Sequence, residues 1–179
     1  SWVNTAFPFA AAYLLTTGQV DATLIIGTIF FLIPYNLAMY GINDVFDYES
    51  DLRNPRKGGV EGALLDTRMH RPTLIASVVT TVPFVVYLVI VGSPLSWLVL
   101  AISLFAVVAY SAKGLRFKEK PFLDSITSST HFVSPAVYGL VLAGAVFTTQ
   151  LWAVLGAFFL WGMASHAFGA VQDVIADRE

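Results

Sequence analysis

The sequence contains no cysteine, which excludes disulfides and metal sites built on thiolates. It is also poor in charge, because only 12% of its 179 residues are Asp, Glu, Lys or Arg. Soluble globular domains carry about twice that share. Apolar residues make up 56% of the chain, and the mean hydropathy is +0.71. This imbalance is too large for the core of a soluble domain, so the composition indicates an integral membrane protein.

Long apolar stretches recur along the whole chain, and most approach the roughly 20 residues that cross a bilayer as a helix. We expect spans near residues 2–17, 22–47, 72–91, 95–111, 122–147 and 151–176. Prolines inside three of them, Pro34, Pro83 and Pro135, predict irregular helices, and Gly156, Gly162 and Gly169 predict close helix contacts in the last span. The sequence therefore predicts an all-α fold, a transmembrane helical bundle of six spans.

The basic residues are confined to alternate connections. All ten lysines and arginines lie in residues 53–71, 113–120 and 178, whereas the connections 17–21, 92–96 and 148–150 contain none. Six spans place every basic residue on one side of the membrane, which the positive-inside rule makes cytoplasmic. We therefore expect a multi-pass protein of the cell membrane. Nothing in the sequence indicates a nucleic-acid partner or fixes the oligomeric state.

An acidic cluster ends the second predicted span. Asn43, Asp47 and Asp51 are four residues apart, so a helix projects them from one side, with Asp44 close by. Carboxylates at this spacing repel one another, and near a membrane they are costly unless a cation compensates them. Oxygen ligands without histidine or cysteine suit a hard cation such as magnesium.

The sixth predicted span ends in the same way, because Asp173 and Asp177 repeat the four-residue spacing. One such cluster is equally consistent with a solvated helix end, whereas two on one face favour a metal site. Between them a basic loop contains Lys113, Arg116, Lys118 and Lys120. Metal ions bridge carboxylates to phosphate oxygens, and basic side chains neutralise the remaining charge. These parts together predict a diphosphate site at the cytoplasmic ends of the spans.

These motifs resemble those of the UbiA superfamily of intramembrane prenyltransferases. The pattern N-x-x-x-D-x-x-x-D is met by Asn43, Asp47 and Asp51, and D-x-x-x-D by Asp173 and Asp177. A Tyr-Ser stretch followed by two basic residues is met at positions 110, 111, 116 and 118. Within the superfamily, the runs 34–44 and 54–59 are most similar to the carotenoid-elongating members, the lycopene elongases.

The resemblance implies a single transmembrane prenyltransferase domain over residues 1–179. It implies a nine-span fold, of which this chain holds the first six, so we expect the domain to be incomplete at its C-terminal end. The expected reaction is Mg²⁺-dependent transfer of a prenyl group from dimethylallyl diphosphate to a lipid-soluble acceptor, lycopene. The expected site residues fall into two groups. The metal-binding or catalytic group is Asn43, Asp44, Asp47, Asp51, Asp173 and Asp177. The group expected to bind the diphosphate is Arg56, Lys57, Tyr110, Arg116 and Lys118.

Three other interpretations remain open at this stage. The acceptor could be an aromatic quinone precursor, because the diphosphate site would be the same. Acidic residues in spans also mark ion pathways, which keeps a divalent-cation transporter in view. A non-catalytic assembly subunit is the third. The sequence does not identify a catalytic base: His131 and His166 lie inside predicted spans, where histidine more often bonds to a neighbouring helix.

Overall fold

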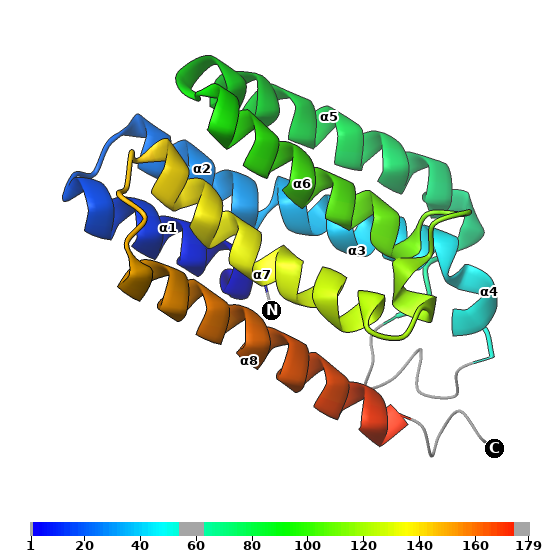
Figure 1. The fold of residues 1–179 in the computed structure, drawn as a ribbon. Helices are drawn as coiled ribbons and strands as arrows, with labels where there is room; N and C mark the ends of the chain where they lie inside the picture. The colour runs from blue at the N-terminus through cyan, green and yellow to red at the C-terminus, as the bar shows by residue number, and fades with distance from the viewer. Residues whose placement is uncertain (1, 54–62, 174–179) are drawn as a thin grey trace.

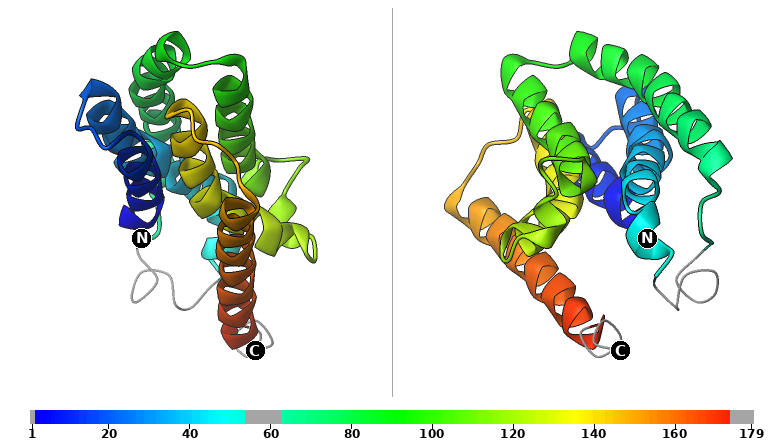
Figure 2. Two further views of the ribbon diagram at one scale, coloured as in Figure 1. Left: turned by 60° about the vertical axis from the view of Figure 1, so that its left-hand side comes forward. Right: turned by 90° about the vertical axis from the view of Figure 1, so that its right-hand side faces the viewer.

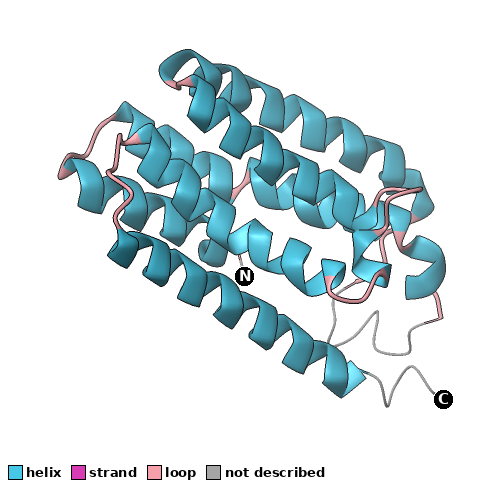
Figure 3. Cartoon of the chain, in the orientation of Figure 1, coloured by secondary structure: helices cyan, strands magenta, loops and turns pink. Residues whose placement is uncertain are grey.

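The computed structural model describes residues 2–53 and 63–173, and it describes side chains as far as Gly169. This part of the chain is helical and contains no strand (Figures 1 and 3). The elements, in chain order, are α1 (Val3–Thr17), α2 (Ala22–Leu32), α3 (Pro34–Phe46), α4 (Tyr48–Asp51), α5 (Thr67–Val91), α6 (Pro94–Ser111), the 3-10 helix η1 (Phe117–Glu119), α7 (Leu123–Leu142) and α8 (Thr149–Asp173). The prediction of an all-α bundle is confirmed.

Four helical stretches in the described residues are long and apolar enough to cross a membrane: 22–46, 67–91, 94–111 and 149–169. The other two predicted spans also form helices of the bundle. The α1 helix has only 15 residues, and α7 carries buried polar side chains, among them Ser129 and His131. The chain is therefore an integral membrane protein in which α7 serves as an interior helix.

The second predicted span is interrupted at Ile33, where α2 ends and α3 begins with Pro34. Proline has no backbone N–H, so carbonyls of the preceding turn lose their helical partners. The Asn36 amide donates to the Phe31 carbonyl over 2.7 Å, and the Thr5 hydroxyl donates to the same oxygen over 2.7 Å. Buried side chains therefore replace the missing helical bonds, as irregular backbone inside a membrane requires.

An aromatic cluster fills the centre of the bundle. Phe9 of α1, Phe30 and Phe31 of α2, Tyr35 of α3 and Tyr138 of α7 are each 0% exposed. Their rings lie within 4.8–6.2 Å of a neighbouring ring in the cluster or of the adjacent Phe84. Because four helices contribute, the cluster fixes their mutual packing around one interior.

The interior helix α7 packs against α1, α6 and α8. A Cβ built on Gly139 would lie 2.8 Å from the Phe9 carbonyl oxygen, so the α1 contact requires glycine there. On the other side, a Cβ on Gly162 of α8 would lie 2.5 Å from the Ser129 hydroxyl. The predicted close contact at Gly162 is thus confirmed, whereas those at Gly156 and Gly169 are not found, since nothing in the described part of the chain lies within 4 Å of a Cβ at either.

The two ends of the bundle differ (Figures 1 and 2). At one end, which we call the turn end, short connections join α1 to α2, α5 to α6 and α7 to α8. At the other, the charged end, α3, α6 and α8 end and α5 and α7 begin. All the described lysines and arginines belong to segments at the charged end. The predicted separation of charge is therefore present in the fold.

Candidate functional site

Asp47 lies where α3 ends at Phe46 and α4 begins at Tyr48. The first acidic motif therefore crosses a junction between two helices, whereas the sequence predicted that it lies on one continuous helix. Helical hydrogen bonds persist through the junction: the Asp47 N–H donates to the Asn43 carbonyl over 2.9 Å, and the Asp51 N–H donates to the Asp47 carbonyl over 2.8 Å. The four-residue repeat is thus retained, and it turns the Asp47 side chain inward, where only 3% of it is exposed.

The Asp47 carboxylate meets two cations from the loop between α6 and α7. The Lys118 ammonium forms an ion pair with Oδ2, and the Arg116 guanidinium lies 3.7 Å from Oδ1. Arg116 also donates to the Phe46 carbonyl over 3.4 Å and pairs with Glu119 over 2.5 Å. The structure therefore brings together one predicted metal ligand and two predicted diphosphate-binding residues.

The backbone of this loop holds the two cations in place. Arg116 has a φ of 40°, in the left-handed region that residues other than glycine rarely occupy, and Phe122 has a φ of 66°. The 3-10 helix η1 lies between them and carries Lys118. Left-handed conformations in such residues persist where surrounding contacts impose them, and here Arg116 is fixed by Asp47, Glu119 and the end of α3.

Asn43 is positioned by a hydrogen bond between distant segments. The Ser111 hydroxyl, at the end of α6, donates to Asn43 Oδ1 over 2.8 Å. The bond leaves a second lone pair on Oδ1. It also joins the Tyr-Ser stretch of the sequence motif to the first acidic motif. Tyr110, the neighbouring residue, turns away towards α7, where its ring packs edge-on against His131 at 5.5 Å between centroids.

The pKa of Asp47 lies above its ordinary value. Burial raises the pKa because it penalises the ionised form, and this outweighs the opposing effect of Lys118 and Arg116. Glu119, at the exposed rim of the site, shows the reverse, since its pKa is lowered by the hydrogen bond from Arg116. An additional cation is therefore compatible with Asp47, whose charge the two basic side chains only partly compensate.

The described residues fit a hard cation in part. Asp47 Oδ1 is buried and accepts no hydrogen bond from them, and Asn43 Oδ1 is also an oxygen ligand. Both are oxygen ligands, which suit a hard cation better than a soft transition metal. Nevertheless, no three His, Cys, Asp or Glu side chains in the described part of the chain are grouped to bind a metal ion. A complete site would need ligands beyond these.

Several predicted residues cannot be placed by side chain. The backbone of α8 ends at Asp173, at the same end of the bundle as α4 (Figure 1), but the Asp173 side chain is outside the described part. Asp177, Arg56 and Lys57 also lie outside the described residues. Asp44 and Asp51 are half-buried beside Asp47. The two acidic motifs thus lie at the same end of the bundle, as the ends of α4 and α8 show. How their side chains are arranged relative to one another stays a prediction.

A second polar cluster, absent from the sequence predictions, joins α7 to α8. His166 Nε2 lies 2.8 Å from Asp124 Oδ2, and both side chains are about one-quarter exposed, 27% and 24%. Asp124 Oδ1 is buried without a hydrogen-bond partner among the described residues. The two residues are 42 positions apart, so no local pattern could connect them. The one available signal was an acid in the first turn of a predicted span.

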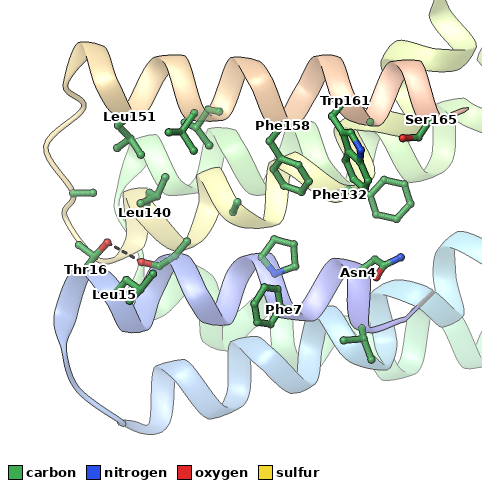
Figure 4. A pocket seen from close by; sticks show the side chains of 18 of the residues that line it. Asn4, Phe7, Leu15, Thr16, Phe132, Leu140, Leu151, Phe158, Trp161 and Ser165 are labelled. Atoms are coloured by element: carbon green, nitrogen blue, oxygen red, sulfur yellow. Dashed lines mark hydrogen bonds between the residues drawn. The ribbon is translucent and has the colours of Figure 1, made fainter. Parts of the chain in front are cut away.

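A cavity of about 1060 Å³ runs between α1, α7 and α8. Its lining is mainly apolar, with Phe7 on α1 opposite Phe132 on α7 and Phe158 and Trp161 on α8 (Figure 4). Thr16 and Leu151 lie towards the turn end, and Asn4 and Ser165 lie towards the charged end (Figure 4). His166 belongs to the lining as well. The cavity is therefore mainly apolar, with polar side chains towards both of its ends.

The chain is similar to known proteins of one family. A model described as the UbiA prenyltransferase family matches residues 5–179. The chain is 70% identical, over all of its 179 residues, to a protein of Dietzia sp. (strain CQ4) named C(50) beta-cyclic carotenoids biosynthesis protein LbtBC, and covers 41% of it. It is 62% identical over its whole length to a lycopene elongase/hydratase of Corynebacterium glutamicum, of which it covers 62%.

More distant relatives are also named lycopene elongase/hydratase. A lycopene elongase/hydratase of Haloarcula japonica is 36% identical over 154 residues, which are 84% of this chain and 49% of that protein. The chain thus spans about two-fifths to three-fifths of the length of these relatives. No solved structure matches it.

Proposed function

Because the chain belongs to the UbiA prenyltransferase family, we propose that it carries the diphosphate site of an enzyme that prenylates a carotenoid. The donor is dimethylallyl diphosphate, the acceptor is lycopene, and the reaction depends on Mg²⁺. The names of relatives with 60–70% identity support the acceptor. Those relatives are longer than this chain, so the proposal concerns the whole protein.

The observation that carries the proposal is the meeting of Asp47 with Lys118 and Arg116. A diphosphate needs positive charge along its oxygens, and an acid beside those cations keeps them extended and in place until the substrate arrives. On binding, Lys118 and Arg116 exchange part of their contact with Asp47 for phosphate oxygens. Asn43, Asp47, Asp51, Asp173 and Asp177 would hold Mg²⁺, which would stabilise the negative charge that develops on the leaving diphosphate.

The chain's own residues supply orientation and exclusion of water. Ser111 holds the Asn43 amide through a 2.8 Å hydrogen bond, and Arg116 ties the loop to the end of α3 through the Phe46 carbonyl. The charged end of the bundle, which faces the cytoplasm in this proposal, meets the soluble donor. The mainly apolar cavity between α1, α7 and α8 suits an isoprenoid chain, and Asn4 and Ser165 line it towards the charged end (Figure 4).

The position of the acids favours this function over cation transport. Asp47 lies at the end of a span beside basic residues, whereas an ion pathway needs carboxylates near the middle of the membrane. The site itself does not distinguish lycopene from an aromatic acceptor. The names of the relatives favour lycopene, so the acceptor is the part of the proposal that an experiment must address directly.

The test is to reconstitute the full-length protein in liposomes with Mg²⁺, labelled dimethylallyl diphosphate and either lycopene or 4-hydroxybenzoate. We expect label in carotenoids that are heavier than lycopene by whole isoprene units, with or without added water. Asp47→Asn should abolish this product, and Asp66→Asn, which changes an exposed acid at the same end, should not. Label recovered only in the aromatic product would overturn the carotenoid assignment.

A further inference from the structure

We propose that His166, oriented by Asp124, is the base that accepts the proton released when the alkylated acceptor is converted to product. This inference rests on the proposed function and assigns the base that the sequence left open. Prenylation of a polyene cannot finish without the loss of one proton.

The atoms and electrons balance in two alternative endings. The terminal double bond of the polyene forms a new C–C bond to the allylic carbon while the C–O bond to the diphosphate breaks, and a tertiary carbocation remains. In one ending, an adjacent C–H bond breaks, its electron pair forms a double bond, and a base takes the proton. In the other, water forms a C–O bond to the cation and the resulting oxonium ion gives its proton to a base. Each ending therefore requires one proton acceptor near the apolar chain.

His166 is the described side chain that meets this requirement. It lines the cavity, seven residues before Asp173 and therefore about 10 Å from the end of α8 at 1.5 Å per residue. Its Nε2 is occupied by Asp124 at 2.8 Å. In the neutral ring, an Nε2–H donating to the carboxylate leaves Nδ1 as the acceptor, and no described residue forms a hydrogen bond with Nδ1.

The surroundings of His166 explain why Asp124 matters. On α7, Asp124 lies against the His166 ring, and His131 also interacts electrostatically with His166. From α6, Tyr110 interacts with Asp124. From α1, the cavity lining contains no titratable side chain. Asp124 is thus the negative charge that stabilises the imidazolium formed by proton transfer, and it also fixes the ring so that Nδ1 is available. Asp124 is a positioning residue in this scheme.

The other interior histidine serves as a contrast. His131 is only 4% exposed, its Nε2 has no described partner, and it does not line the cavity. It has neither a carboxylate held against its ring nor access to the cavity. His166 has both, and its partial exposure gives the proton a route to water after each turnover.

The experiment uses the full-length protein in liposomes with lycopene and dimethylallyl diphosphate, and it measures elongated carotenoid and released diphosphate separately. In His166→Gln, the side chain can still bond to Asp124 but cannot accept a proton. We expect elongated product to fall about 100-fold, while diphosphate release falls less than about tenfold. The ratio of released diphosphate to elongated product should therefore rise at least about tenfold. His70→Gln, a change in a histidine of α5 outside the cavity, should leave the ratio unchanged.

Two results would overturn the inference. If His166→Gln forms product at the wild-type rate and ratio, the base lies elsewhere, and the released diphosphate becomes the first alternative. If product and diphosphate release fall in the same proportion, His166 acts before proton removal. In either case, a wild-type protein that elongates lycopene leaves the proposed function standing, whereas a wild-type protein that forms no elongated carotenoid refutes the proposed function itself.

Asp124→Asn supplies a readout that a purely structural role would not change. It removes the charge that stabilises the imidazolium, so elongated product should fall more than diphosphate release, with a smaller change in their ratio than in His166→Gln. Asp124→Glu keeps a carboxylate and should recover the wild-type ratio. Equal falls in product and diphosphate release in Asp124→Asn would refute the role of this pair.

Discussion

The two ends of the bundle differ in how their helix ends are held. At the turn end, the caps are local: Asp21 accepts from the Leu24 N–H over 2.8 Å, and Ser93 and Ser96 cap α6 reciprocally. A longer-range bond, 3.1 Å between the hydroxyls of Thr23 and Tyr87, also joins α2 to α5 there. At the charged end, the partners are far apart in sequence, as with Asn43 and Ser111, which are 68 residues apart. Moreover, Asp47 Oδ1 and Asp124 Oδ1 are buried there without a described hydrogen-bond partner.

This difference separates stability from function. Local caps hold helices together and contribute to folding without regard to a substrate. Unsatisfied buried oxygens cost folding free energy, and a ligand or a reacting group beside Asp47 and Asp124 would explain why these two are retained. We therefore expect substitutions at the charged end to change activity more than stability, and substitutions at the turn end to do the reverse.

The largest effect is expected from Asp47→Asn. Activity should fall about 10³-fold, a loss of the size seen when one preorganised electrostatic contact to a developing charge is removed. Thermal stability without Mg²⁺ should stay the same or rise, because burial already raises the pKa of Asp47 and penalises its ionised form. The measurements are carotenoid elongation and thermal unfolding of the purified protein. A large loss of stability would show that Asp47 is a structural acid.

A smaller effect is expected from Lys118→Met. This change removes one charged contact to the diphosphate, which is typically worth about 1.5–3 kcal/mol, or roughly tenfold to 100-fold in KM for the donor. Lys113→Met changes an exposed lysine of the same loop and should leave KM within about twofold, as expected for a solvated surface charge. Equal effects of the two variants would indicate a general attraction by the basic loop in place of a specific contact.

Much of this division could be predicted from the sequence. The helices and their order follow from hydropathy, and the confinement of charge to one end follows from the positions of lysine and arginine. Both signals can be recognised within single segments of the sequence. For Asp47, Arg116 and Lys118, the sequence predicted only that they lie on the same side of the membrane and belong to motifs of one family. It did not predict their direct contact. The interruption of the second span at Pro34 was anticipated as an irregularity, and the repair of its backbone by Thr5 and Asn36 was not.

The rest depended on tertiary packing. Asp124 and His166 come together because Gly162 lets α8 approach Ser129 of α7, and no sequence period encodes that approach. The same reason explains why the contacts predicted at Gly156 and Gly169 are not found in the described part of the chain: a glycine in a span allows close packing but does not require a neighbour. The sequence therefore predicted which segments carry charge to one end of the bundle, but not which side chains of different helices touch.

At the turn end, Ser93→Ala should reduce stability by about 1 kcal/mol, the usual cost of losing an N-cap. Ser93 accepts from the Ser96 N–H over 3.4 Å, and the Ser96 hydroxyl accepts from the Ser93 N–H over 2.8 Å. Because the two bonds form one capping box, Ser96→Ala in the Ser93→Ala background should cost less than it does alone. Chemical or thermal unfolding measures both, and elongation activity should be unchanged. A matching loss of activity would contradict the separation of the two ends.

The smallest effect is the pH dependence of the cap at Asp21. Its pKa is lowered from 3.8, first by the hydrogen bond from the Leu24 N–H and then by that from the Tyr13 hydroxyl. A lowered pKa means that the carboxylate stabilises the folded protein above pH 3.8 and that this contribution disappears as pH falls through the folded-state value. The difference in unfolding temperature between the wild type and Asp21→Asn should thus be constant near neutral pH and change only in acid. Tyr13→Phe removes one of the two donors, so in that background the change should be complete at a higher pH, closer to 3.8. If the difference instead varied between pH 5 and 8, a group other than Asp21 would be titrating, and the turn end could no longer be described by its local caps alone.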